Sequence, residues 1–207
     1  MGRCFGEGDP LMAAYHDLEW GRPVVGEAAH LERLALEAFQ SGLSWRVVLA
    51  KREAFREVFH GFEPEVVAAF GPDDVERLLL DARIVRNRAK VEAVVAGARA
   101  TVALHEAGTT LAELLAGYAP DPVPAVESWL DLPSSTAESV ALARDLKRLG
   151  FRFVGPTTAY ATMQAIGLVN DHLAGCPARA DAGRDGPPAV IVVRAEQGVI
   201  TRSAETP

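Results

Sequence analysis

The sequence predicts an all-α protein, and three observations support this fold class. Apolar residues recur at helical spacing through most of residues 30–168. Proline or glycine stands at the ends of these apolar segments, where such residues typically begin or end helices. Alternating patterns that would indicate strands are scarce. A succession of helices is therefore expected.

Local signals justify each expected helix. Ser41-Gly42 ends the first helix, Ser135 and Glu138 form an S-x-x-E capping box for a later one, and Gly150 ends it. Prolines suited to a first turn begin three others, at Pro64, Pro72 and Pro156. The expected helices cover residues 30–39, 45–59, 64–70, 72–80, 87–105, 136–149 and 156–168.

Two segments do not suit a regular helix. Four prolines make an extended connection between residues 118 and 133. Helical patterning ends at Cys176, and a segment rich in glycine and proline follows. We therefore expect one helical domain over residues 1–177 and a linker with a tail over residues 178–207. The tail sequence AVIVVRAEQGVITR is compatible with a short β-hairpin or with a disordered end.

Composition and charge exclude several classes. With 207 residues, 49% hydrophobic and 24% charged, the chain is an ordinary globular protein, not a collagen-like or disordered one. No apolar run is long enough for a membrane helix, and the charged N-terminal segment does not suit a secretory signal, so a cytoplasmic protein is expected. A net charge of −7 argues against general binding of nucleic acid.

Two cysteines and two histidines form the first candidate site. Cys4 and His16 lie near the N-terminus, and three residues separate His172 from Cys176. Two thiolates and two imidazoles suit a tetrahedral structural zinc site without an open position for water. The alternative is a buried thiol with histidines scattered over the surface.

Cations gather in two short segments that hold eight Lys or Arg and a single acid, residues 83–90 and 144–152. The first lies at a helix–hairpin–helix junction and contains Arg83, Arg86, Arg88 and Lys90. Backbone N–H groups at such a junction can bind a DNA phosphate. A solvated charged face remains the alternative.

Aromatic and acidic residues form the third candidate site: Tyr15, Trp20, Glu37, Trp45 and Tyr160. They suit a base-stacking pocket with one carboxylate, although spaced aromatics are also typical of a core. Glu37 falls roughly 110° from the middle of the apolar face of its helix, so periodicity alone indicates a surface glutamate.

At these residues the chain resembles the DNA-3-methyladenine glycosylase I family of base-excision repair. The resemblance lies in AYHDLEWG near the N-terminus, the hairpin DARIVRNRAKVEAV, and LVNDH followed by a closing cysteine. It spans residues 3–176. It implies a helix-hairpin-helix glycosylase fold and alkylated double-stranded DNA as the partner. A monomer is expected, because wedging into DNA needs only one copy of the chain.

The resemblance also implies site residues. Structural zinc would be bound by Cys4, His16, His172 and Cys176. Glu37 would be the catalytic carboxylate, in a base pocket with Tyr15, Trp45 and Tyr160. Leu43 would fill the gap left by the flipped nucleotide, and the hairpin cations Arg83, Arg86, Arg88 and Lys90 would contact DNA.

The expected activity is hydrolytic excision of 3-methyladenine by a monofunctional DNA glycosylase. The alternative is a non-catalytic, zinc-stabilised module that binds DNA lesions. Two residues depart from the family pattern. Met12 stands where relatives often have tyrosine. Arg83 stands where the family hairpin usually has glycine, and a left-handed backbone at a non-glycine residue costs about 1 to 2 kcal/mol.

Overall fold

The computed structural model describes residues 2–122, 124–182, 190–193 and 200–203. These residues divide into two compact units. Unit 1 comprises Met1–Val25, Pro120–Pro133 and Met163–Pro207, and unit 2 comprises Gly26–Ala119 and Ser134–Thr162. None of the described helices has the length and hydropathy needed to span a membrane. The expected domain boundary after residue 177 stays a prediction.

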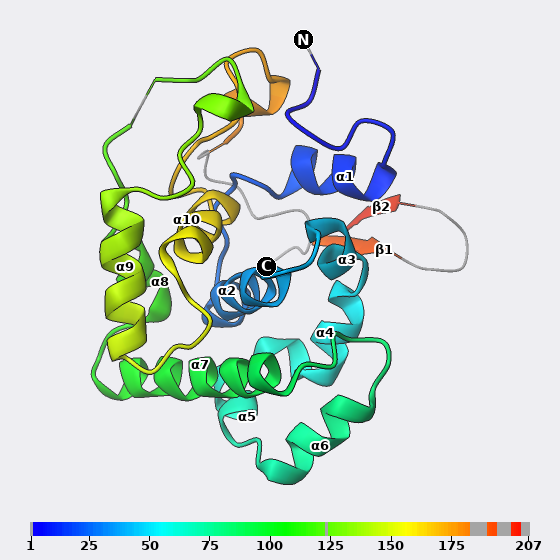
Figure 1. Cartoon of the computed structure of the whole chain (residues 1–207), viewed down its shortest axis with the longest axis vertical. Coiled ribbons are helices and arrows are strands. Elements are labelled where there is room, and N and C mark those ends of the chain that lie inside the picture. The colour runs from blue at the N-terminus through cyan, green and yellow to red at the C-terminus, as the bar shows by residue number, and fades with distance from the viewer. Residues whose placement is uncertain (1, 123, 183–189, 194–199, 204–207) are drawn as a thin grey trace. The chain divides into compact units, whose positions relative to one another are not determined.

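Unit 2 contains most of the helices (Figure 1). They are α2 (Glu27–Gln40), α3 (Trp45–Ala50), α4 (Arg52–Val58), α5 (Pro64–Ala68), α6 (Pro72–Leu80), α7 (Arg88–Glu106), α8 (Leu111–Ala116), α9 (Ala137–Arg148) and the beginning of α10 (Pro156–Ala165). The prediction of an all-helical fold is confirmed for this unit, and prolines begin α5, α6 and α10 as expected.

A cluster of phenylalanines forms the core of unit 2. The rings of Phe39 and Phe55 lie 4.4 Å apart, and Phe59 stacks on both Phe62 and Phe70. The turn η1 (His60–Phe62) has positive φ at all three residues, which is strained for the two that are not glycine. Burial of the Phe62 ring offsets this strain, because the side chain is fully inaccessible.

Unit 1 contains α1 (Pro10–Leu18), the short turns η2 (Trp129–Asp131) and η3 (Pro177–Ala180), the end of α10 and two strands. Asp9 caps α1 by accepting hydrogen bonds from the Leu11 and Met12 amides. The strands β1 (Val190–Val193) and β2 (Ile200–Ser203) pair antiparallel, with Val190 opposite Ser203. This agrees with the hairpin alternative for the tail, and its other residues beyond Ala182 lie outside the described ones.

Two local predictions were wrong, and two helices were missed. The helix expected over residues 45–59 is two helices, because the backbone turns at Lys51. The capping box of α9 is formed by Thr136 and Ser139 instead of Ser135 and Glu138. Two helices were not predicted, α1 and α8, although Asp9-Pro10 and the Thr110–Glu113 capping box are signals for them.

Candidate functional site

The two cysteines and two histidines come together in unit 1. Cys176 Sγ lies 3.4 Å from His16 Nε2 and 3.5 Å from His172 Nδ1, and Cys4 Sγ lies 3.6 Å from His172 Nδ1. All four ligand atoms lie within 4.8 Å of one another. Ligands at zinc-like bond lengths of about 2.0 to 2.3 Å from a tetrahedral centre would stand about 3.6 Å apart. The cluster therefore has the dimensions of a tetrahedral metal site.

The second nitrogen of each imidazole is held by an acceptor. His16 Nδ1 lies 2.8 Å from Asp17 Oδ1, and His172 Nε2 lies 3.1 Å from the Trp20 carbonyl oxygen. Such contacts orient a ligating histidine and select the tautomer with its free nitrogen toward the metal. Arg3 in turn binds Asp17, which holds the pKa of that carboxyl below its usual range. The hydrogen-bond acceptors around the two histidines therefore fit a metal site, as do the four ligand residues.

Burial acts on the ligand groups themselves. It raises the pKa of the Cys4 thiol to about 11 and lowers the pKa of His172 to about 4. The neutral imidazole is the form that binds a metal, and a bound divalent cation would deprotonate the thiol despite its burial. Gly21 is required beside this cluster, because it has a φ of 77° and a Cβ there would lie 3.0 Å from His172 Nε2.

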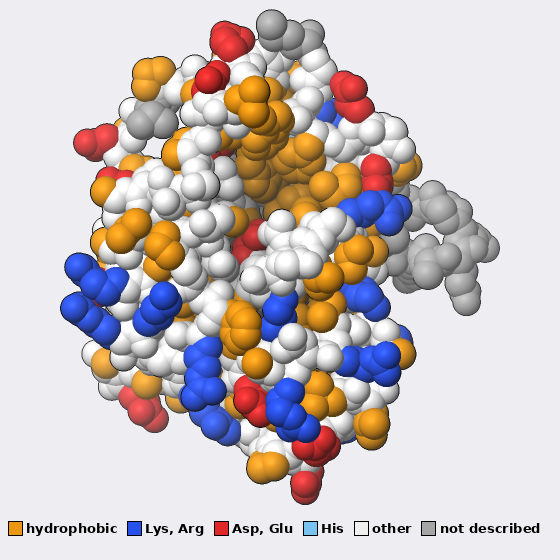
Figure 2. Space-filling model, in the orientation of Figure 1, with side chains coloured by type: hydrophobic (Ala, Val, Ile, Leu, Met, Phe, Trp, Pro, Cys, Tyr) orange, Lys and Arg blue, Asp and Glu red, His pale blue; other side chains and the backbone are white. Residues whose placement is uncertain are grey.

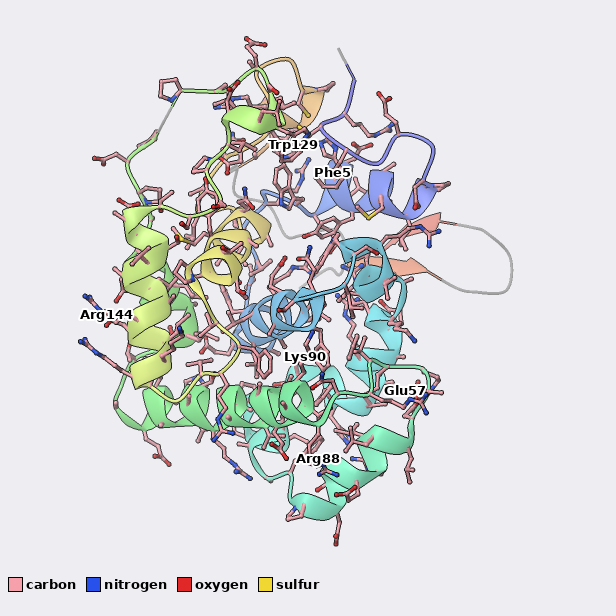
Figure 3. The ribbon with its side chains drawn as sticks, in the orientation of Figure 1. Phe5, Glu57, Arg88, Lys90, Trp129 and Arg144 are labelled. Atoms are coloured by element: carbon pink, nitrogen blue, oxygen red, sulfur yellow. The ribbon has the colours of Figure 1, made fainter. Side chains whose placement is uncertain are left out.

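Aromatic side chains that sequence reasoning missed cover the cluster. The Phe5 ring lies edge-on to His16, with centroids 4.8 Å apart, and Trp129 Nε1 donates to the Cys4 carbonyl oxygen. Figure 3 shows Phe5 and Trp129 beside each other. The proline-rich connection thereby packs on the cluster, which gives that extended segment a structural role. A tryptophan within a proline-rich loop is the signal that was overlooked.

Glu37 is buried in unit 2. Its residue is 7% exposed, on a helix whose residues 30–39 are all buried. Because α2 is covered on every side, the surface position that periodicity indicates is wrong. Desolvation raises the pKa of Glu37 to about 8, and the charge of Arg33 opposes this shift. A carboxyl group that titrates near neutral pH inside a protein is typical of a functional site.

The predicted aromatic pocket residues are divided between the units. Tyr15 is buried on α1 in unit 1. Trp45 is half-buried at the beginning of α3, and Tyr160 is buried on α10, both in unit 2. Leu43 lies in the loop between α2 and α3 and is 39% exposed.

The cations of residues 83–90 lie in and after the α6–α7 connection, also in unit 2. Arg83 is bound by Asp81 and Glu57, and Arg88 is bound by Glu76. Arg86 is exposed and, within the described part of the chain, has no ion pair. Lys90 was expected to contact a phosphate. Instead it is buried, and its ammonium donates to the carbonyl oxygens of Phe39 and Ser41.

The backbone at Arg83 is not left-handed, since the non-glycine residues with positive φ among the described ones are His60, Phe62 and Phe153. The strain expected from arginine in the glycine position is therefore not present. Instead Asp81 accepts a hydrogen bond from the Arg83 amide, which shapes the turn from within. Figure 2 shows further Lys and Arg side chains over α9, where Arg144, Lys147 and Arg148 lie.

A model of the family described as methyladenine glycosylase matches residues 5–180 of this sequence. The chain belongs to the methyladenine glycosylase family. A curated relative, DNA-3-methyladenine glycosylase 1 of Escherichia coli strain K12, is 44% identical over 170 residues, which are 81% of this chain and 91% of that protein.

Solved structures of this glycosylase family share the fold. A crystal structure of 3-methyladenine DNA glycosylase I has 44% identity, covers 82% of this chain and 94% of its own, and gives a TM-score of 0.79. A tyrosine-to-phenylalanine variant of such an enzyme, in complex with 3-methyladenine, has 35% identity, covers 84% and 96%, and also gives 0.79.

We expect the stability of this glycosylase to depend on pH through Glu37. Its folded pKa of about 8 lies above its ordinary value of 4.5, so the folded state binds the extra proton between these values. The stabilisation by the neutral carboxyl is complete below pH 4.5 and is lost as the pH rises through 8. We therefore compare the free energies of unfolding of Glu37→Gln and wild type at two pH values. The difference between them should favour Glu37→Gln by roughly 3 to 5 kcal/mol more at pH 8.5 than at pH 4.5.

Urea unfolding of both proteins at the two pH values measures this difference. The exposed Glu106 at the end of α7 provides the control, because Glu106→Gln should leave the difference unchanged. A stability difference between wild type and Glu37→Gln that is the same at both pH values would contradict the raised pKa.

Proposed function

We propose that this protein excises 3-methyladenine from alkylated double-stranded DNA by hydrolysing the bond between the base and the sugar. The observation that carries the proposal is the buried carboxyl of Glu37 in a chain of the methyladenine glycosylase family. Relatives named for this activity at 40 and 44% identity support it. The protein would act as a monomer in the cytoplasm, with DNA as its partner.

The chemistry follows from the charge of the substrate. Methylation at N3 makes the adenine of a nucleotide cationic and weakens the bond from N9 to C1′ of the sugar. When this bond breaks, its electron pair goes to N9 and the base leaves as a neutral molecule. Water adds to C1′ and gives up its proton to solvent. Protonation of the leaving group by an acid is therefore unnecessary, and we assign no general base.

Glu37 has the properties that recognition of a cationic base requires. A carboxylate accepts hydrogen bonds from the exocyclic amino group, and in a desolvated place its charge interacts strongly with the cation. Since burial raises the pKa of Glu37 to about 8, binding of the cation would release the carboxyl proton near neutral pH. An uncharged adenine offers no compensation for that ionisation, so the same carboxyl favours the methylated base.

Aromatic residues would bind the flipped base by stacking. We assign this role to Tyr15, Trp45 and Tyr160, as the family resemblance implies. A tyrosine-to-phenylalanine variant of such an enzyme, at 35% identity, was solved in complex with 3-methyladenine, which supports 3-methyladenine as the base that is bound. Stacking recovers part of the few kcal/mol that base flipping costs. Leu43, exposed in the loop after α2, would fill the space that the base leaves.

The α6–α7 connection would bind the DNA backbone as a helix-hairpin-helix motif. Asn87 caps α7, and the first amides of this 19-residue helix offer donors to a phosphate. Among the arginines, Arg86 is available for a phosphate contact, whereas Arg83 and Arg88 must first leave their carboxylate partners. The exposed location of these ion pairs makes such an exchange inexpensive.

Arg86 and Arg83 are therefore expected to contribute unequally to DNA affinity. Arg86→Ala should lower the slope of log K against log salt by about 0.9, the value for one phosphate contact, and Arg83→Ala should lower it by less. Fluorescence anisotropy on a methylated duplex between 50 and 200 mM salt measures both slopes. Arg77→Ala removes an exposed arginine of α6 and serves as the control. Equal slopes for wild type and Arg86→Ala would contradict the contact.

Zinc is the metal that we propose for the cluster in unit 1. Cys4, His16, His172 and Cys176 would bind it, and with four protein ligands its contribution would be structural. It would tie residues near the two ends of the folded chain together. The spacing of the ligand atoms and the acceptors on both imidazoles support this assignment.

Released bases provide the deciding test of the proposed function. Methylated duplex DNA is incubated with the full chain, and the supernatant is analysed by chromatography. Free 3-methyladenine with an intact DNA strand is the expected result, because hydrolysis leaves an abasic site without strand cleavage. Tight binding of methylated DNA without any released base at stoichiometric protein would overturn the proposal and favour a lesion-binding module.

A further inference from the structure

Lys90 has a buried ammonium group that the chemistry above does not use. It is the third residue of α7 and is 6% exposed. Its Nζ donates to the carbonyl oxygen of Phe39 at 2.9 Å and to that of Ser41 at 2.6 Å. Burial lowers its pKa, yet two carbonyl acceptors compensate the cation. Figure 3 shows Lys90 on α7 near the end of α2.

The two acceptors lie where the wedge loop begins. We use this name for residues 40–44, which connect α2 to α3 and contain Leu43. Phe39 is in the last turn of α2, and Ser41 is its C-cap, so their carbonyls belong to a helix end without intrahelical partners. The ammonium satisfies both and complements the negative end of the helix dipole. Lys90 thus caps the C-terminal end of α2 and holds the first residues of the wedge loop.

A second lysine makes the reverse connection. Lys51, at the junction of α3 and α4, donates to the carbonyl oxygens of Ala82 and Arg83 in the α6–α7 connection, at 3.3 and 2.8 Å. Lys90 connects α7 to the wedge loop, and Lys51 connects the junction of α3 and α4 to the α6–α7 connection. The two segments are therefore held in a defined relative position within unit 2.

The rest of the wedge loop is short and constrained. The Leu43 amide donates to the Gln40 carbonyl oxygen at 2.6 Å, and Gly42 has a φ of 80°. Because Gly42 alone separates Ser41 from Leu43, a shift of the Ser41 carbonyl at its contact with Lys90 would also move the Leu43 side chain. A wedge must enter the duplex at a fixed distance from the phosphate that the hairpin holds.

We propose that Lys90 is a positioning residue for base flipping, which holds Leu43 in register with the phosphate-binding hairpin. This inference rests on the proposed glycosylase function. Lys90 acts through the loop and does not touch the base, so its loss affects duplex DNA and spares the free base. A misplacement of about 1 Å in a positioning contact can lower a rate by about 100-fold.

The test compares Lys90→Met with wild type in single-turnover release of 3-methyladenine from duplex DNA. We expect release to fall by about 10- to 100-fold, while binding of free 3-methyladenine, measured by calorimetry, changes by less than about threefold. Leu43→Ala completes a double-mutant cycle. Because Leu43→Ala removes the wedge that Lys90→Met displaces, the double variant should be no slower than the slower single variant.

Arg99 provides a matched control on the same helix. It also donates to two carbonyl oxygens at the end of a helix, that of Ala68, the last residue of α5, and that of Phe70 just beyond it. Both lie far from the wedge loop in sequence. Arg99→Met should lower stability without the loss in release. Should Lys90→Met fail to fold, Lys90→Arg retains a cation with altered geometry and takes its place in the same cycle.

Three outcomes overturn the positioning role while wild type remains active: unchanged release by the Lys90 variant, multiplicative effects with Leu43→Ala, or an equal loss of free-base binding. An inactive wild type would instead overturn the proposed function itself, so the two failures are distinguishable.

Discussion

Glu37→Gln is expected to lower the release of 3-methyladenine from alkylated duplex DNA by roughly 100-fold at pH 8. The substitution keeps the size and one acceptor of the side chain but removes the negative charge that, in the proposed site, would face a cationic base. Loss of such a charge-assisted contact in a desolvated site costs about 2 to 4 kcal/mol, and each 1.36 kcal/mol changes a rate tenfold. Single-turnover release from a methylated duplex measures the effect.

The pH dependence of release separates this role from a purely structural one. With a pKa of about 8, Glu37 becomes more ionised as the pH rises from 6 to 9, so wild-type kcat/KM should rise over that range and then level. The Glu37→Gln profile should lack this rise. Glu106→Gln, which removes an exposed carboxyl, should match wild type throughout. Full activity of Glu37→Gln would remove this residue from the mechanism.

Loss of the proposed zinc is expected to have the largest effect on stability. Structural zinc contributes roughly 10 to 16 kcal/mol of apparent binding energy in zinc-finger peptides, and part of this is folding energy. Chelation, or replacement of Cys176 by serine, should therefore lower the melting temperature by about 10 °C or more in a chain of this size. Differential scanning calorimetry measures the shift, and elemental analysis should find one zinc per chain.

Chelation and the Cys176→Ser substitution test the same proposed zinc site by two independent treatments. Chelation should have no further effect on Cys176→Ser, and added zinc should restore the chelated wild type but not the variant. A wild-type protein that is purified without metal and keeps its melting temperature in chelator would contradict the zinc assignment. In that case the cluster would be two buried thiols with hydrogen-bonded histidines.

Local signals predicted much of the helical framework but not its details. Pro64, Pro72 and Pro156 begin helices as expected, because proline has a fixed φ and no donor to lose there. The capping box of α9 shifted by one residue, since Ser135 and Thr136 offer the same chemistry and only the packed helix selects between them. Two neighbouring helices merged in the prediction, because Trp45 to Phe59 keep one apolar period across the turn at Lys51.

In the candidate site, residue types were easier to predict from the sequence than the burial of charged side chains. The set of two cysteines and two histidines was predicted from the sequence, because these residue types suit zinc and because the family resemblance implies this set. Helical periodicity failed for Glu37, since it assumes one solvent-exposed face and α2 has none over residues 30–39. Charge runs failed for Lys90 in the same way, because its acceptors lie about 50 residues away in the chain.

The sequence by itself determined the helical fold class, the set of cysteines and histidines that could hold a metal, and the resemblance to the glycosylase family. The tertiary structure decided which charged groups face solvent and which are buried, and therefore that Glu37 titrates near pH 8 and that Lys90 caps the C-terminal end of α2. The physical reason is that desolvation and hydrogen bonding depend on partners brought together from distant parts of the chain, whereas helix ends and ligand types depend on neighbouring residues and on chemistry alone.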